Sequence, residues 1–355
     1  MMIQLADAIA AGPFPIVVEL VASGVKREAQ LLEIASNLAN VPEVVAGSIA
    51  SYADGRAGQD PVRVGCAVRA RGLQPNIHLT CVNRDRVAMR QTLRELKALG
   101  LFSVVALTGD RSAGAGASER RAQGDPGERR VQGDPAYATS SELDSVQLTE
   151  MIAHLRTSEG APFFISVAVS PFLYERETVL AQYTRLEQKV AAGANLAITK
   201  PGWDARKFAE LKRYVDERGL KLPLLGNVHV LTRRVAEQLA TTTVPGAGIS
   251  SALVDTVRKE SDSADGGTKA GLERAARTLA VLKGLGYAGA YITGTHAAEH
   301  VSQILHRADA LKGDWQRCAD DLQFGETDGF YLDAAAGTAS GAAGATRVHP
   351  APSQS

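Results

Sequence analysis

Polar side chains that could carry acid–base or binding chemistry stand at the ends of several apolar, β-like runs. A carboxylic acid that is partly shielded from water keeps its proton near neutral pH and can deliver it to a substrate. A histidine or a hydroxyl beside it can bind or orient a ligand. The residues of this kind are Glu19 in VVELV, Ser48 in VVAGSIA, His78 and Thr80 in NIHLTC, and Asp110 directly after SVVALTG.

Each of these positions also has a purely structural interpretation. A single glutamate in a strand can face water or the end of a helix, and His78 could be a core histidine with a satisfied hydrogen bond. Several polar residues at strand ends together favour a site, because ligand pockets combine apolar walls with a few converging polar groups. We therefore expect these side chains to meet in one cavity.

A competing motif is HAAEH at residues 296–300, which fits the inverted zinc-peptidase pattern His-x-x-Glu-His. Two histidines four residues apart on a helix could bind zinc, with Glu299 as the general base. A third ligand is needed, and only a short acidic stretch and a polar tail follow His306. We therefore expect no metal site here.

The elements that would position these residues alternate along the chain. In the stretch 84–100 apolar residues recur at intervals of three and four, with Gly100 as a stop signal, which predicts a helix. The same pattern predicts helices over 173–193, 204–219 and 266–286. The strand-like runs between the helical stretches cover 15–21, 44–50, 76–82, 103–109, 163–169, 194–199, 222–228 and 288–294.

This alternation predicts a parallel α/β fold, and eight strands are the number of a (β/α)8 TIM barrel. The long interval between the seventh and eighth strands predicts extra helices there. In such a barrel the carboxyl ends of the strands carry the active site, which explains why core strands end in polar groups. A doubly wound open sheet is the alternative, but VELVASGVKREA after the first strand has a single glycine where a phosphate-binding turn would be glycine-rich.

We expect one barrel domain over 1–333 that contains one irregular segment, followed by an irregular tail. The stretch 111–136 repeats a short unit, ERRAQGDPG and then ERRVQGDPA, and its composition predicts a flexible loop. The stretch 334–355 has almost no large apolar side chains and is expected to be a disordered tail.

Composition excludes several classes of protein. The 355 residues contain 39 basic and 39 acidic side chains, so the chain has no excess positive charge that would indicate binding to nucleic acid or an anionic membrane. No apolar run approaches the length of a transmembrane helix, and the first residues do not resemble a secretory signal. The 3 cysteines are far apart in sequence, which favours a reducing, cytoplasmic location. A homo-oligomer stays open.

Two motifs resemble the methylenetetrahydrofolate reductase family. HLTCVNRDRV with VVALTGD resembles the family's third strand and its Ala-Leu-x-Gly-Asp signature. KVAAGANLAITKPGWD, residues 189–204, resembles Lys-Val-x-Ala-Gly-Ala-x-x-x-x-Thr-Gln-x-x-x-Asp. LPLLGNVHVL and AYITGTH match more weakly, and together the resemblance covers residues 14–310.

The resemblance implies a (β/α)8 barrel that binds FAD, takes hydride from NADH or NADPH, and converts 5,10-methylenetetrahydrofolate to 5-methyltetrahydrofolate. Opening the folate ring requires a proton on N10, which produces an iminium that accepts hydride. The family's acid matches Glu19, and its pterin- and flavin-contacting aspartate matches Asp110. The direction stays open, since the same chemistry supplies methyl groups for methionine or oxidises them.

The resemblance also implies the ligand contacts. The flavin positions are Ser48, His78, Thr80, Leu107, Thr108, Gly109, Asp110 and Lys189, with Lys189 toward a phosphate, and Ser170 and Tyr174 where the family has an aromatic residue and a histidine. The substrate positions are Asp110, Lys200 in place of a glutamine, and His296 in place of an arginine.

These departures leave two alternatives open. One is a member of the family that works without flavin or with another cofactor. The other is a non-catalytic folate- or flavin-binding partner of a methyltransferase, which the presence of Glu19 disfavours.

Overall fold

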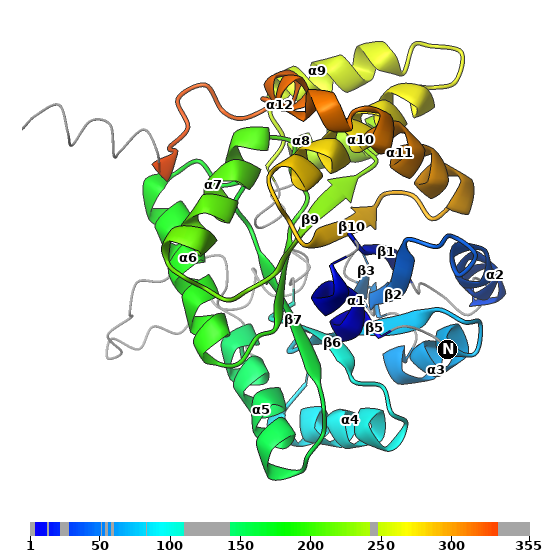
Figure 1. Ribbon diagram of the computed structural model, residues 1–355, viewed down its shortest axis with the longest axis vertical. Helices are drawn as coiled ribbons and strands as arrows, with labels where there is room; N and C mark the ends of the chain where they lie inside the picture. The colour runs from blue at the N-terminus through cyan, green and yellow to red at the C-terminus, as the bar shows by residue number, and fades with distance from the viewer. Residues whose placement is uncertain are drawn as a thin grey trace, which may run out of the picture.

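The eight predicted strands close into a parallel barrel in the computed structural model (Figure 1). The structure describes residues 4–12, 14–21, 28–50, 60–82, 84–109, 143–241 and 248–332, and the backbone alone at 52–53 and 56–57. Asp110 and the segments 111–136 and 334–355 therefore lie outside the described residues. The strands are β1 (Ile16–Val21), β2 (Val44–Ala50), β5 (Gln74–Thr80), β6 (Ser103–Leu107), β7 (Phe164–Val169), β8 (Leu196–Thr199), β9 (Leu224–His229) and β10 (Gly289–Thr293).

Each strand pairs in parallel with its neighbours, in the order β1-β10-β9-β8-β7-β6-β5-β2, and β1 closes onto β2. The predicted (β/α)8 class is thus confirmed, and the open doubly wound sheet is excluded. Two very short strands, β3 (Tyr52–Ala53) and β4 (Arg56–Ala57), form a separate antiparallel pair after β2.

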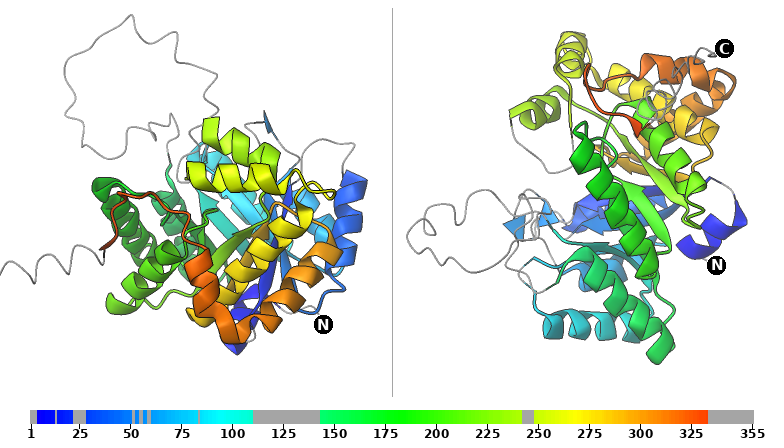
Figure 2. Two further views of the ribbon diagram at one scale, coloured as in Figure 1. Left: turned by 90° about the horizontal axis from the view of Figure 1, so that it is seen from above. Right: turned by 90° about the vertical axis from the view of Figure 1, so that its left-hand side faces the viewer.

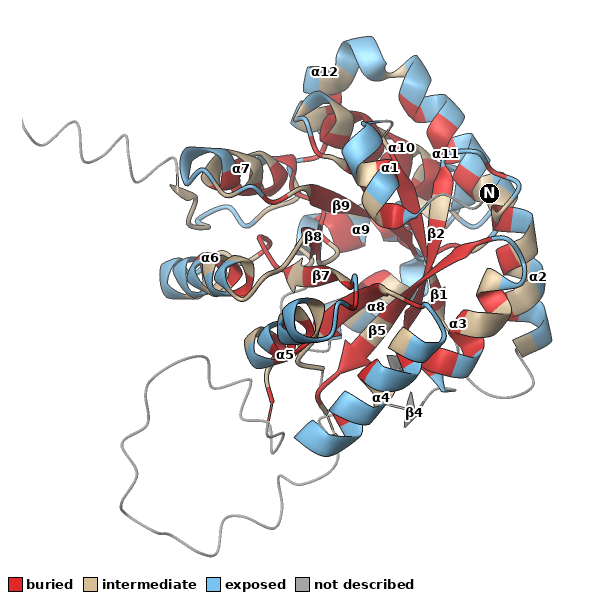
Figure 3. Cartoon of the chain, turned by 60° about the horizontal axis from the view of Figure 1, so that its bottom comes forward, coloured by how far each residue is buried: buried red, intermediate tan, exposed pale blue. Residues whose placement is uncertain are grey.

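Helices surround the barrel. Those beside the first six strands are α2 (Glu28–Leu38), α3 (Pro61–Arg69), α4 (Arg86–Ala98), α5 (Ser145–Ser158), α6 (Arg176–Ala191) and α7 (Ala205–Glu217). Their starts follow from local sequence: Asp85 accepts from the Ala88 amide at 2.7 Å, and Asp144 forms a capping box with Gln147. Figure 3 shows that their exposed residues face outward, away from the buried strands.

The predicted extra helices between the seventh and eighth strands are confirmed. They are α8 (Arg233–Thr241), α9 (Ser251–Glu260) and α10 (Thr268–Gly284), followed after β10 by α11 (Ala298–Ala310), the 3-10 turn η3 (Lys312–Asp314) and α12 (Trp315–Asp321). Figures 1 and 2 show these helices gathered on the side of the barrel that carries β9 and β10. None of the helices in the described ranges is long and apolar enough to cross a membrane.

The N-terminal helix closes the barrel interior at the end where the strands begin. The N-terminal helix α1 (Leu5–Ala11) inserts Leu5 beside lumen residues near the strand starts, and the Leu5 amide donates to Gln74 at 2.6 Å. The apolar lumen residues are Leu5, Val17, Ala46, Val105, Leu196, Ile198, Leu225 and Tyr291. Ligands must therefore enter from the opposite face, where the strands end.

Candidate active site

Glu19 lies near the end of β1, with its side chain half-buried. Burial disfavours the charged carboxylate and raises the pKa of Glu19 from 4.5 to about 7, while a hydrogen bond from the Tyr291 hydroxyl lowers it in part. A carboxyl group with this pKa holds a proton in a substantial fraction of molecules at neutral pH. The predicted acid is thus placed where it can store a proton.

Ser48 and His78, two of the predicted ligand-binding residues, contact each other. Strand register sets Glu19 opposite Ser48 and Ser48 opposite Asn76, so the three side chains point to the same face of the sheet from adjacent strands. The Ser48 hydroxyl lies 2.8 Å from His78 Nε2, and the Tyr291 hydroxyl lies 3.3 Å from the same nitrogen. Burial lowers the pKa of His78 to about 4, so its imidazole is neutral at pH 7.

We call Glu19, Tyr291, His78, Ser48 and Asn76 the mouth network. Within it, Asn76 Nδ2 donates to Ser48 Oγ at 3.3 Å, and Ser103 donates to Asn76 Oδ1 at 2.9 Å. These contacts join side chains from β1, β2, β5, β6 and β10. The network therefore ties the predicted acid to most of the strands on its side of the barrel.

Thr80, Leu107, Thr108 and Gly109, which are also predicted ligand contacts, lie at or just after the ends of β5 and β6. Thr80 pairs in register with Leu107, and Thr108 Oγ1 accepts from the Ser145 amide at 3.2 Å. Gly109 has φ +92°, and a Cβ there would lie 2.6 Å from Val82, so the turn before Asp110 requires glycine.

His296 is placed directly beside the acid. Its Nδ1 donates to the Glu19 carbonyl oxygen at 2.9 Å, across the β1–β10 pair. Burial lowers the pKa of His296, so Nε2 stays an acceptor near pH 7. His296 therefore contacts the main chain of the residue predicted to be the acid.

Two predicted lysines lie on the other side of the barrel mouth. Lys200 follows β8 and is half-buried, and its main-chain amide donates to Val169 at 2.8 Å. Lys189 on α6 is buried, and Nζ donates to the Ala168 carbonyl at 2.7 Å. Burial first, and then the nearby charges of Arg185 and Lys200, lower the pKa of Lys189 to about 7. Ser170, also predicted, is buried just after β7.

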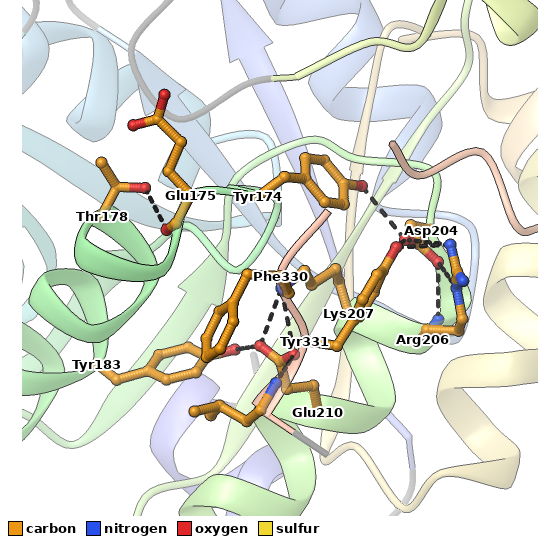
Figure 4. Close-up of polar contacts among 11 residues, drawn as sticks. Tyr174, Glu175, Thr178, Tyr183, Asp204, Arg206, Lys207, Glu210, Phe330 and Tyr331 are labelled. Atoms are coloured by element: carbon orange, nitrogen blue, oxygen red, sulfur yellow. Dashed lines mark hydrogen bonds and ion pairs between the residues drawn. The ribbon is translucent and has the colours of Figure 1, made fainter. Parts of the chain in front are cut away.

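Tyr174 lies in a different cluster, outside the mouth network. Its hydroxyl donates to Asp204 at 3.3 Å, and its ring meets Tyr331 edge-on at 6.0 Å (Figure 4). The main chain of Phe330 donates to the Tyr174 carbonyl at 2.8 Å, so the C-terminal segment packs against this residue.

Several polar residues of the lumen were absent from the sequence-based set. His229 Nδ1 lies 2.8 Å from Thr293 Oγ1, and Thr293 donates to Asn227 Oδ1 at 2.9 Å. Because the single hydroxyl proton goes to Asn227, His229 must donate through Nδ1, which leaves Nε2 as a buried acceptor with no partner among the described residues. Tyr291 and Asn76 were missed as well. His229 ends its strand as a polar residue, the same signal that selected His78.

FAD would bring a ring system and a doubly charged pyrophosphate. For the ring, Ser48, His78 and Thr80 offer polar partners at the ends of neighbouring strands. For the pyrophosphate, Lys189 does not fit: it is buried, its Nζ already donates to a carbonyl, and its pKa is lowered. Of the residues predicted to hold FAD, Ser48, His78 and Thr80 thus suit its ring, and Lys189 does not suit its pyrophosphate.

The HAAEH motif does not form a zinc-binding pair. His296 precedes α11 and bonds to the Glu19 carbonyl, while His300 Nδ1 lies 3.0 Å from Thr295 Oγ1. Within the described ranges, no three His, Cys, Asp or Glu side chains are grouped as metal ligands would be.

Comparison with known proteins identifies the family. The methylenetetrahydrofolate reductase family model matches residues 24–128 and 123–309. The chain is 27% identical to the 5,10-methylenetetrahydrofolate reductase of Salmonella typhimurium (strain LT2) over 158 residues, 44% of each protein. It is 28% identical to that of Escherichia coli (strain K12) over 158 residues, again 44% of each. The matched part thus spans less than half the length of these curated relatives.

A solved structure shares the fold. It is an uncharacterized protein from Clostridium thermocellum that binds two copies of 5-methyl-5,6,7,8-tetrahydrofolic acid. The TM-score is 0.56 at 10% identity, over 88% of this chain and 100% of that one. This likeness shows the fold alone. Because the family model covers most of the barrel, the chain belongs to the methylenetetrahydrofolate reductase family.

Proposed function

We propose that the chain interconverts 5,10-methylenetetrahydrofolate and 5-methyltetrahydrofolate, with NADH or NADPH as the electron partner. Family membership supports the class of reaction. The observation that carries the proposal is Glu19, a half-buried acid with a pKa of about 7 at the open end of the barrel. A folate-binding partner protein without activity would not need such an acid.

In the reducing direction Glu19 donates its proton to N10 of the folate. The N10–methylene bond breaks, and the carbon becomes an iminium on N5. Hydride from the nicotinamide then adds to that carbon, giving the N5-methyl group and oxidised nicotinamide. One proton and one hydride are consumed, so the step balances, and Glu19 is left as a carboxylate to be reprotonated by solvent.

The remaining predicted residues position the substrate. We assign Asp110 to the pterin, as the family signature implies. Lys200 is a donor only, so it suits a carbonyl or carboxylate oxygen of the folate. We assign His296, whose Nδ1 bonds to the Glu19 carbonyl oxygen, to the substrate beside the acid.

The family resemblance assigns FAD as hydride carrier, with Ser48, His78, Thr80, Leu107, Thr108, Gly109, Asp110, Ser170 and Tyr174 around it and Lys189 toward its pyrophosphate. Because the buried Lys189 does not suit the pyrophosphate, we route no step through FAD. Direct hydride transfer from the nicotinamide to the folate is the alternative that this lysine favours.

An anaerobic assay with the purified full chain tests the proposal. The expected result is oxidation of NADH or NADPH that depends on methylenetetrahydrofolate and yields methyltetrahydrofolate in equal amount. A visible spectrum decides the carrier: flavin bands that bleach on adding methyltetrahydrofolate support FAD, and activity in a colourless protein supports direct transfer. No turnover with either nicotinamide, with or without added FAD, would contradict the proposal.

A further inference from the structure

Among the described residues, Tyr291 touches both the acid and the histidine of the mouth network. It lies on β10 with its ring buried in the lumen beside Val17 and Leu225. Its hydroxyl bonds to the Glu19 carboxylate and to the Ser48 side chain, and lies 3.3 Å from His78 Nε2. A tyrosine kept only for packing would not need its hydroxyl between two titratable groups.

The other members of the network fix the direction of their hydrogen bonds. Ser103 donates to Asn76 Oδ1, which orients the amide so that Nδ2 donates to Ser48 Oγ. The Ser48 proton is then directed to His78 Nε2 at 2.8 Å. His78 is thereby held as the tautomer that accepts at Nε2. The hydroxyl of Tyr291 is the part of the network whose direction is not fixed by its neighbours.

We propose that Tyr291 is a positioning residue whose hydroxyl supports Glu19 in both of its protonation states. When Glu19 is a carboxylate, Tyr291 donates to it. When Glu19 is protonated, Tyr291 accepts from the acid and turns its own proton toward Ser48 Oγ, to which its hydroxyl also bonds and which itself donates to His78 Nε2. This inference rests on the proposed function for its catalytic meaning.

Such a switch lets Glu19 release a proton without leaving an unpaired buried charge, which is costly in a lumen. Tyr291 itself stays protonated throughout, because burial and the neighbouring carboxylate raise its pKa well above 10. The proton that reaches N10 is therefore the proton of Glu19, and the hydroxyl of Tyr291 only rotates.

The titratable groups that face Glu19 are few among the described residues. Tyr291 approaches from β10, His78 from β5, and His296 from the segment after β10. Burial lowers the pKa of both histidines, so neither adds a positive charge near pH 7. Changes at Tyr291 or His78 should therefore act on Glu19 through hydrogen bonding.

Two variants test the switch with opposite signs. Tyr291→Phe removes the donor to the carboxylate, so the pKa of Glu19 should rise by about one unit. His78→Leu removes the acceptor of the Ser48 proton, which then turns to the Tyr291 oxygen and leaves the Tyr291 proton for Glu19, so the same pKa should fall. Infrared difference spectra of the protonated carboxyl group, taken against Glu19→Gln in the ligand-free full chain, measure this pKa.

Tyr287→Phe is the matched control. Tyr287 is also buried, but its hydroxyl donates to the Phe208 carbonyl at 2.9 Å, away from Glu19. This variant should leave the pKa of Glu19 unchanged. If Tyr291→Phe shifts the pKa no more than Tyr287→Phe, or if His78→Leu raises it, the inference is overturned.

The readout separates this inference from the proposed function. The pKa shifts are measured without substrate, so they are expected even in a chain that does not reduce methylenetetrahydrofolate. In an active enzyme, the pH at which kcat/KM falls on the basic side should also rise in Tyr291→Phe, by as many pH units as the pKa of Glu19. The same variant should lower kcat about tenfold. If the pKa of Glu19 shifts but the basic side of the kcat/KM profile does not, then a group other than Glu19 causes the loss of activity at high pH.

Discussion

Two buried polar clusters of this barrel treat their carboxylates in opposite ways. The mouth network holds Glu19 against neutral groups only, and its pKa is raised to about 7. The second cluster, beside the start of α7, comprises Tyr174, Tyr183, Asp204, Arg206, Lys207, Glu210 and Tyr331, and we call it the α7 cluster (Figure 4).

In the α7 cluster each carboxylate meets strong donors. Glu210 accepts from Lys207 at 3.2 Å, from Tyr183 at 2.6 Å and from the Leu332 amide at 3.0 Å. Asp204 accepts from the Arg206 side chain at 3.2 Å and from Tyr331 at 2.5 Å. Lys207 also donates to the Phe330 carbonyl at 2.7 Å, so these charges hold the C-terminal segment onto α7.

The difference shows what each cluster is suited to do. Paired buried charges fix one geometry, and removing one partner is costly because the other stays buried. A buried acid without a cation costs stability while it is charged, but it can exchange a proton at neutral pH. The α7 cluster therefore holds the structure together, and the mouth network is suited to chemistry.

The largest expected effect on folding comes from breaking the pair in the α7 cluster. Lys207→Met should lower the free energy of unfolding by about 3–5 kcal/mol, because it leaves Glu210 charged and buried. Urea unfolding measures the change. Lys212→Met on the same helix is the control: Lys212 pairs with exposed Asp216, so its loss should cost less than about 1 kcal/mol. Equal losses in the two variants would contradict the contrast.

Removing the carboxylate of the mouth network should stabilise the protein, whereas breaking the ion pair of the α7 cluster destabilises it. The pKa of Glu19 is raised in the folded state, so the folded protein binds more protons than the unfolded chain between pH 4.5 and about 7. Stability from this group is therefore lost as pH rises through that window. Glu19→Gln removes the loss and should stabilise the protein by up to about 3 kcal/mol at pH 8, with a smaller gain at pH 5.

Unfolding measured from pH 5 to pH 8 in both proteins checks this. Taking the difference between Glu19→Gln and the unchanged protein cancels the contributions of His78 and His229, whose pKa values burial lowers to about 4. A difference that does not grow with pH would mean that Glu19 is solvated.

A smaller effect is expected at the rim of the α7 cluster. Tyr331→Phe removes one donor to Asp204, but Arg206 remains, so the loss should be about 1–2 kcal/mol. Proteolysis near the C-terminus should become faster at the same time, because Tyr331 belongs to the segment held on α7. If Tyr331→Phe changes neither the free energy of unfolding nor the rate of proteolysis, then Lys207 alone holds the C-terminal segment on α7.

The sequence predicts the barrel well because strand and helix periods are local signals. All eight strands fall within the predicted runs or within two residues of them, as with β5 at Gln74–Thr80 against 76–82. It also places Glu19, Ser48, His78 and Thr80 at strand ends on one face. It cannot predict that Ser48 and His78 bond to each other, since that depends on register between strands.

What the sequence misses depends on distant contacts. Tyr291 in GAYIT looks like a packing residue, and only closure of β10 onto β1 brings its hydroxyl to Glu19. Tyr174 looks like a ligand contact because it follows β7, yet the C-terminal segment, far along the chain, packs against it. Asp110 lies outside the described residues, so its assignment stays a prediction.

The most direct test compares turnover of methylenetetrahydrofolate with NADH or NADPH in three proteins: the unchanged chain, Glu19→Gln, and Glu43→Gln as a control at an exposed glutamate before β2. We predict that Glu19→Gln lowers kcat about 10²- to 10⁴-fold, because the amide cannot supply the N10 proton, and that Glu43→Gln does not. Turnover in Glu19→Gln equal to that of the unchanged chain would contradict the assignment of Glu19 as the acid.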